Sequence, residues 1–302
     1  MDADAAPDDA EVPARIAVVT DSAAGLPPAW LEPGGAAHGI RTVALPVLVG
    51  HDILTGEHDD VTAPLMLALA AGADVRTSRP SPGQFDRAYG QLADEGFDGV
   101  VSVHLSGLLS GTVDAARMAA ARASLPVEVI DTRTAGMAQG RAALAALDAV
   151  RTGAELHAAA ATAAMVARAS SLYFYVPSVE QLRRGGRITA AAGWLGTLLS
   201  VRVILHVRGG ALVPLERMRS AARGLQRLEE LTATDVAARS GSVHLTVHHF
   251  GNEEDALALA ERLGTVARAA SVSTAPCPAV LAAHAGLGVL AVTVSSAAAG
   301  ER

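Results

Sequence analysis

Side chains with hydroxyl groups gather in three short segments that follow or flank apolar runs of the sequence. These segments are Thr20-Asp21-Ser22, Thr77-Ser78-Arg79-Pro80-Ser81 and Ser106-Gly107-Leu108-Leu109-Ser110-Gly111-Thr112. Hydroxyl groups, together with the backbone N–H groups at the start of a helix, are suited to holding a small anion. The sequence therefore indicates an anion-binding site that is built from loops.

A fourth segment, His284-Ala285-Gly286-Leu287-Gly288, adds a titratable side chain. Its two glycines allow the backbone to approach a ligand closely. Each of the four segments also has a purely structural interpretation, because serine and threonine commonly cap helices and a single histidine is commonly a hydrogen-bonded structural residue. The chemistry of the residues alone leaves both interpretations open.

The well-known catalytic and cofactor-binding patterns are missing from the sequence. It has no P-loop, no G-x-G-x-x-G fingerprint, no H-E-x-x-H or C-x-x-C pair and no G-x-S-x-G elbow. The adjacent pair His248-His249 is a poor metal site, because neighbouring residues of a strand point to opposite faces. We therefore expect no metal and no cofactor.

The elements that must position these segments follow an alternating pattern up to about residue 140. Short apolar runs at residues 16–20, 99–105 and 127–130 read as buried strands, and helical segments separate them. A further apolar run at residues 42–49 contains Pro46, which predicts an edge position or a bulge. This alternation predicts a mostly parallel sheet that is covered on both faces.

The pattern changes to shorter, mixed elements after about residue 170. Residues 201–207 and 211–215 read as a hairpin around Arg208-Gly209-Gly210, and residues 289–294 read as a last strand. We predict an α/β protein with a disordered tail at residues 1–14 and an N-terminal domain at residues 15–168, which carries the anion-binding loops. A smaller, mixed α/β C-terminal domain is predicted at residues 169–302.

Composition narrows the classes of function. Of the 302 residues, 50% are apolar and 18% are charged, as is typical of a folded globular protein. The net charge of −7 argues against a nucleic-acid partner. The single cysteine, Cys277, lies between two prolines and is interpreted as a small buried hydrophobe. Residues 1–12 lack the pattern of a signal peptide, so we expect a cytoplasmic protein.

Taken together, five segments resemble the sequence motifs of the DegV family, in the same order and from about residue 16 to about residue 294. Those motifs are Thr-Asp-Ser after an opening strand, Thr-Ser-Gln-Pro-Ser-Pro-Gly, Leu-Ser-Gly-Thr, Gly-Gly-Arg-Ile and His-x-Gly-Pro-Gly. The matching segments here are Thr20-Asp21-Ser22, residues 77–83, Leu109-Ser110-Gly111-Thr112, Gly185-Gly186-Arg187-Ile188 and residues 284–288.

The resemblance implies a two-domain DegV-type fold that holds a long-chain fatty acid in a buried tunnel between the domains. It implies that the carboxylate is held by Thr77 or Ser78, by Ser106 and by His284. The residues expected to support the binding loops are Asp21, Ser22, Ser110, Gly286 and Gly288. Two arginines, Arg187 and Arg202, are candidates for contact with a partner or with a phosphoryl group.

The resemblance also implies how the bound fatty acid is used. A separate ATP-binding fatty acid kinase subunit phosphorylates the acid, so this chain is expected to be a non-catalytic, monomeric lipid-binding subunit that makes at most transient contact with a membrane. The sequence departs from the family pattern at Arg79, Gly107, Val203 and Leu287, where glutamine, serine, proline and proline are usual. Arg79 adds a positive charge that an anionic head group could use.

An alternative of a different class stays open. The chain could be an enzyme that acts on a small phosphorylated or carboxylic substrate with Asp21, Ser106 and His284 as its catalytic groups. The enzyme would turn over its substrate without a partner, whereas the lipid-binding subunit would retain fatty acid and need the kinase.

Overall fold

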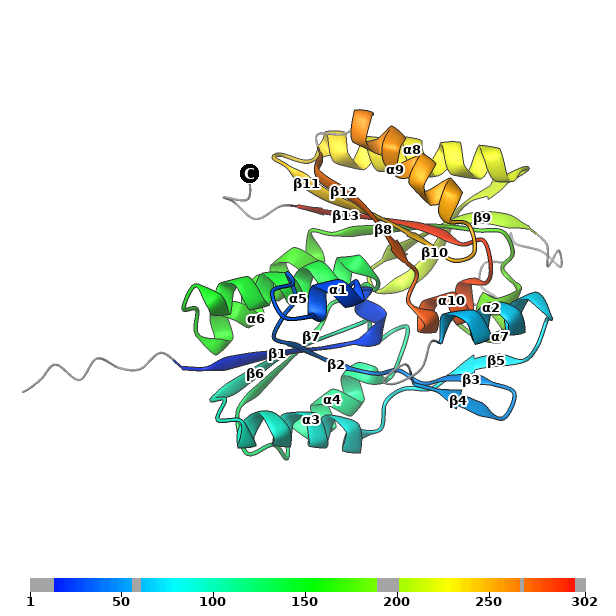
Figure 1. Cartoon of the computed structure of the whole chain (residues 1–302). Helices are drawn as coiled ribbons and strands as arrows, with labels where there is room; N and C mark the ends of the chain where they lie inside the picture. Colours follow the sequence, from blue (N-terminus) through cyan, green and yellow to red (C-terminus); the bar gives the residue numbers. More distant parts are fainter. Residues whose placement is uncertain (1–13, 56–60, 189–200, 267–268, 297–302) are drawn as a thin grey trace, which may run out of the picture.

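The structure is a computed structural model that describes residues 14–55, 61–188, 201–266 and 269–296 (Figure 1). Most of the predicted tail, residues 1–13, lies outside the described residues, as do residues 297–302 of the predicted C-terminal domain. No helix within the described ranges combines the length and the apolar character needed to cross a membrane.

A four-stranded parallel sheet forms the first half of the chain, in the order β2-β1-β6-β7. Its strands are β1 (Ile16–Asp21), β2 (Ile40–Val43), β6 (Gly99–His104) and β7 (Val127–Asp131). Helices α3 (Pro82–Asp94) and α4 (Thr112–Ala120) cover one face, and α5 (Met137–Arg151) and α6 (Leu156–Arg168) cover the other (Figure 1). Both β1 and β6 are therefore buried along their whole length, which confirms the predicted parallel, doubly covered sheet.

A six-stranded mixed sheet forms the second half, in the order β10-β9-β8-β13-β11-β12. The strands are β8 (Ser171–Val176), β9 (Arg202–Arg208), β10 (Ala211–Met218), β11 (Val243–His249), β12 (Ala269–Pro276) and β13 (Leu290–Ser296). Helices α8 (Ala221–Ala238) and α9 (Glu253–Val266) cover the face that points away from the first half (Figure 1). The predicted hairpin is confirmed as the antiparallel pair β9–β10.

A small antiparallel sheet and several short helices complete the chain beside the two main sheets. The small sheet has the order β4-β3-β5, with β3 (Val47–Val49), β4 (Asp52–Leu54) and β5 (Val75–Thr77). The apolar run around Pro46, where an edge position or a bulge was expected, does not form one strand. Pro46 lies between β2, at the edge of the parallel sheet, and β3 of the small sheet. The short helices are η1 (Ser22–Ala24), α1 (Pro28–Leu31), α2 (Thr62–Ala70), α7 (Glu180–Arg184) and α10 (Ala279–Ala285).

The side chains of β8 and β9 alternate between two hydrophobic cores, as the period of two in a strand requires. Tyr173, Tyr175 and Ile204 pack against α8 and α9 with the core of the second half. The residues between them face the other way: Leu172, Phe174, Val176, Val203 and Leu205 join a core that also contains residues of the first half, such as Leu45 and Leu105. This shared core is where the candidate site lies.

A buried histidine forms a polar connection between the two halves. The Met137 backbone N–H at the start of α5 donates to Nε2 of His248 on β11, at 3.0 Å. On the other side of the ring, Nδ1 lies 3.3 Å from the Pro276 carbonyl oxygen. Burial disfavours the charged ring and lowers the pKa of His248 to about 4.

We expect His248 to make the protein sensitive to acid. The unfolded chain binds a proton at this ring near pH 6.5, whereas the folded chain does so only near pH 4. The contribution is thus present above pH 6.5 and is lost as the pH falls through this window, by about 3 kcal/mol. Denaturant unfolding at neutral and acidic pH should show less pH dependence for His248→Gln than for the wild type. His51→Gln, at an exposed histidine, should keep the wild-type dependence; an equal dependence in all three proteins would contradict the prediction.

Candidate functional site

An apolar cavity lies in the core that the two halves share. It holds about 620 Å³ of space free of atoms, counting the part open to solvent. Its apolar lining comes from loops of the first half and from strands and helices of the second: Leu45, Leu105, Leu109, Ala135, Phe174, Val176, Leu182, Leu205, Leu212, Val280, Leu281 and Ala285. With one aromatic ring among these residues, the walls are almost wholly aliphatic.

Polar side chains are confined to a few positions in this lining, and two of them meet directly. Thr77 Oγ1 lies 2.8 Å from His284 Nε2, although the residues are 207 positions apart in the chain. Thr77 points inward because it lies two positions after the buried Val75 on β5. On α10, His284 follows Val280 by one helical turn, so both side chains line the cavity.

The His284 ring is uncharged at neutral pH. Burial, and to a smaller extent the positive charge of Arg187, lowers its pKa to about 4. A neutral imidazole has one N–H donor and one acceptor nitrogen, so the ring and the Thr77 hydroxyl can exchange donor and acceptor roles. Either the Thr77 hydroxyl or the remaining ring N–H is therefore available to donate a hydrogen bond to a carboxylate, and the ring does not first have to gain a proton.

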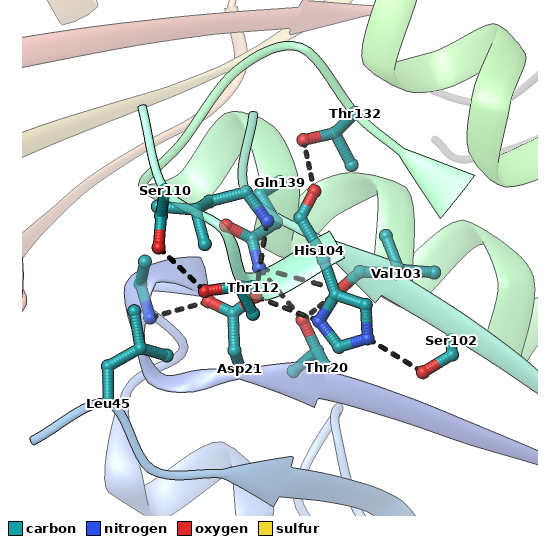
Figure 2. Close-up of polar contacts among 12 residues, drawn as sticks. Thr20, Asp21, Leu45, Ser102, Val103, His104, Ser110, Thr112, Thr132 and Gln139 are labelled. Atoms are coloured by element: carbon teal, nitrogen blue, oxygen red, sulfur yellow. Dashed lines mark hydrogen bonds and ion pairs between the residues drawn. The ribbon is translucent and has the colours of Figure 1, made fainter. Parts of the chain in front are cut away.

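Three further polar residues of the lining are Ser78, Ser110 and Arg187. The Ser110 hydroxyl is 2.8 Å from Thr112 Oγ1 at the start of α4, as Figure 2 shows. Arg187 Nε donates to the Leu109 carbonyl oxygen at 3.1 Å, and its Nη1 donates to the Gly185 carbonyl oxygen. The predicted residues Thr77, Ser78, Ser110, Arg187 and His284 are thus brought together at one cavity.

The structure places Ser106 elsewhere. Its side chain is buried and is not part of the cavity lining; its hydroxyl donates to the Gly210 carbonyl oxygen at 2.7 Å. That carbonyl belongs to the turn between β9 and β10, to which Arg133 also donates through Nε and Nη2, at the Gly209 carbonyl oxygen. Ser106 therefore connects residues 106–112, here called the hydroxyl-rich loop, to the second half of the protein.

Asp21 and Ser22 do not line the cavity, but they hydrogen-bond the backbone of residues that do. Asp21 Oδ1 accepts from the Ala23 backbone N–H at 3.0 Å, and Oδ2 accepts from the Leu105 backbone N–H at 3.1 Å. Ser22 Oγ accepts from the Leu45 backbone N–H at 3.0 Å. Since Leu45 and Leu105 line the cavity, both polar side chains fix apolar wall residues through their backbone.

A buried histidine that we did not predict extends this support (Figure 2). His104 Nδ1 lies 2.9 Å from Asp21 Oδ2, and its Nε2 lies 2.7 Å from Ser102 Oγ. This Asp–His–Ser order is that of a hydrolase triad, but the side chains of Asp21, Ser102 and His104 have no exposed surface. The Ser102 hydroxyl is also 2.8 Å from the Tyr89 hydroxyl, so the chain of polar groups is enclosed and has a structural role.

Gly286, Gly288 and Arg202 lie outside the cavity lining. Both glycines have positive φ, at 83° and 78°, and turn the chain from α10 into β13. Arg202 is exposed at the start of β9, where it hydrogen-bonds Tyr175. The alternative catalytic set is also dispersed: Asp21 pairs with His104, Ser106 with Gly210 and His284 with Thr77, and no hydrogen bond joins these three residues to one another.

Among the residues that the structure describes, no group of three or more His, Cys, Asp or Glu side chains is arranged to hold a metal ion.

Comparison with known proteins identifies the family to which this fold belongs. The family model described as "Uncharacterised protein, DegV family" matches residues 15–297. The chain belongs to the DegV family.

Relatives in the DegV family extend over almost the full length of the chain. A DegV domain-containing protein of Streptomyces coelicolor is 42% identical over 283 residues, which cover 93% of this chain and 99% of the relative. A DegV domain-containing protein of Mycobacterium tuberculosis is 37% identical over 288 residues, which cover 92% and 96% of the two chains.

Two solved structures of DegV proteins share the fold, and both proteins are described as binding fatty acids. The DegV family protein of Thermus thermophilus superimposes with a TM-score of 0.84 at 30% identity, covering 94% of this chain and 100% of its own. DegV of Bacillus subtilis superimposes with a TM-score of 0.84 at 27% identity, with the same coverage. The two-domain DegV-type α/β fold is thereby confirmed.

Proposed function

We propose that this DegV protein binds a long-chain fatty acid, with the acyl chain in the aliphatic cavity and the carboxylate at Thr77, Ser78 and His284. The observation that supports this most directly is the cavity itself, whose aliphatic walls enclose a few convergent polar groups. The fatty acids bound by its structural neighbours are consistent with the proposal. Ser110 and Arg187 complete the polar set, and Ser106 would contribute through the β9–β10 turn.

The energetics favour a long chain over a short one. Burying about fifteen methylene groups contributes about 12 kcal/mol at roughly 0.8 kcal/mol each, before the cost of ordering the chain and of lost translation. A buried carboxylate is costly unless it is hydrogen-bonded, and the Thr77–His284 pair supplies that bond. A short-chain acid would make the same hydrogen bonds through its carboxylate but would bury far fewer methylene groups, so it should bind more weakly.

We further propose that the chain is the lipid-presenting subunit of a fatty acid kinase and is not itself an enzyme. In the kinase step a carboxylate oxygen attacks the γ-phosphorus of ATP, the bond to the bridging oxygen of ADP breaks, and an acyl phosphate forms. The partner would supply ATP, its metal ion and the catalytic groups. Domains at residues 15–168 and 169–302, a monomeric state and a cytoplasmic location are part of the same proposal.

The first test is mass spectrometry of an organic extract of the purified protein, followed by titration of the delipidated protein with palmitate. Thr77→Val should weaken binding about tenfold to a hundredfold, because a hydrogen bond to a charged group contributes about 1.5–3 kcal/mol. Thr162→Val is the matched control, since that threonine is half-buried on α6, away from the cavity lining, and its hydroxyl donates to its own helix at the Ala158 carbonyl oxygen. A protein that neither carries nor takes up fatty acid would refute the proposal.

A further inference from the structure

The side chain of Arg79 packs against Gly111, which is next to Ser110 of the cavity lining. A Cβ atom added to Gly111 would lie 2.8 Å from Arg79 Nη1 and 2.9 Å from its Cδ. The side chain of Arg79 therefore lies flat against the Gly111 backbone, in space that only glycine leaves free. Gly111 directly precedes α4, and its neighbour Ser110 lines the cavity.

A second guanidinium group is held at the other end of the same three-residue segment. Arg187 donates to the Leu109 carbonyl oxygen, whereas Arg79 lies on Gly111. Consecutive Cα atoms are about 3.8 Å apart, so the two anchoring residues are within about 8 Å of each other. Ser110, a residue of the cavity lining, lies between them. The segment 109–111 is thus flanked by two positive charges.

The Arg79 guanidinium has no hydrogen bond and no ion pair with any residue of the described ranges. Arg76, on the same segment of chain, is different: it forms an ion pair with Asp74 at 2.8 Å. Holding Arg79 over Gly111 therefore serves no internal ion pair that the structure describes, and its charge is available to a ligand.

We propose that Arg79 makes the head-group site selective for a dianionic, phosphoryl-type head over a carboxylate. The inference rests on the proposed function and extends it to the phosphorylated form of the ligand. A carboxylate carries one charge, which the Thr77–His284 pair and Arg187 can bind. A phosphoryl head is larger, carries close to two charges and has additional acceptor oxygens, which a second guanidinium group can bind outside the cavity proper.

The test compares palmitate with pentadecylphosphonate at mildly alkaline pH, where the phosphonate is dianionic. Both probes carry the same alkyl chain, so the ratio of their affinities reports on the head group. Arg79→Gln should weaken phosphonate binding about fivefold to tenfold and change palmitate binding by less than about twofold. Because the contact is exposed, the effect should shrink as salt is added.

Arg76→Gln is the matched control, since it removes the same charge from an exposed arginine that is already paired with Asp74. It should leave the affinity ratio unchanged. Equal weakening of both probes by Arg79→Gln, or no effect on either, would overturn the inference, whereas the proposed function would stand as long as the wild-type protein binds palmitate. If the wild-type protein binds neither probe, the proposed function fails and this inference fails with it.

Discussion

Gly185→Ala should weaken fatty acid binding strongly without unfolding the protein. A Cβ atom at this position would lie 2.3 Å from His284 Nδ1 and 2.7 Å from His284 Cε1. The imidazole must then rotate away, which breaks its 2.8 Å contact with Thr77. Loss of an oriented hydrogen bond to the carboxylate should weaken palmitate binding about tenfold or more, measured by titration of the delipidated protein.

The backbone conformation at Gly185 is one that alanine adopts readily. The substitution should therefore lower the affinity for fatty acid and leave the stability of the fold almost unchanged. The residue ends α7 with φ of −75° and ψ of −8°, in the right-handed helical region. Alanine is favoured over glycine there by about 0.5–1 kcal/mol, which offsets part of the cost of moving His284. The free energy of unfolding should therefore change by no more than about 1 kcal/mol.

Gly90→Ala separates the effect on His284 from the effect of an added methyl group on a helix. Gly90 lies inside α3, and a Cβ atom added there meets nothing within 4 Å. This variant should gain about 0.5–1 kcal/mol of stability and keep wild-type affinity. If Gly185→Ala also keeps wild-type affinity, His284 has no part in holding the head group.

The strands that carry the site could be predicted from local sequence, because their signal is local. The apolar, β-branched run at residues 16–20 forms β1, and the Arg208-Gly209-Gly210 turn joins β9 to β10. In contrast, β12 (Ala269–Pro276) was missed, since its alanine and serine residues have low strand propensity and it is held by pairing with β11. Helix α10, which carries His284, was missed for a similar reason: its seven residues are too few for a clear helical period.

The site residues depended on a resemblance and not on local patterns. Nothing in the residues around Thr77 indicates that it meets His284, because that contact is made by the packing of α10 against β5. The hydroxyl-rich loop shows the limit most clearly. Ser106 and Ser110 are four positions apart, and the turn that joins them, with the Ser110 N–H donating to the Ser106 carbonyl oxygen, directs only Ser110 to the cavity.

His104 had a signal that could have been used. It ends β6 beside β1, and parallel strands side by side bring their carboxyl ends to the same edge, where Asp21 also lies. A histidine and an aspartate at adjacent strand ends predict a contact, and the structure has one at 2.9 Å. The sequence could not show that both side chains are sealed from solvent, since that depends on the helices packed over them.

Gly210→Ala should loosen the β9–β10 turn and speed the release of bound fatty acid. The glycine has φ of +93°, and a Cβ atom would lie 2.7 Å from Ser106 Oγ, the atom that donates to the Gly210 carbonyl oxygen. The turn must then move off the hydroxyl-rich loop. Since Leu212 lines the cavity two residues later, the movement opens one wall. Transfer of palmitate to acceptor vesicles should be about tenfold faster, as expected for the loss of a buried hydrogen bond of about 1–1.5 kcal/mol.

Alanine at position 210 strains the backbone as well as clashing with Ser106, so the experiment needs a control that carries the strain alone. Arg133, whose side chain donates to the Gly209 carbonyl oxygen, has φ of +53°, a conformation that costs a non-glycine residue about 1 kcal/mol or more. Gly241 has nearly the same φ as Gly210, at +94°, but a Cβ atom there meets nothing within 4 Å. Gly241→Ala therefore carries the backbone strain without the clash. It should lower stability by about 1–2 kcal/mol and leave the release rate unchanged. Equal release rates for the two variants would mean that the turn does not control the cavity wall and that lipid leaves by another route.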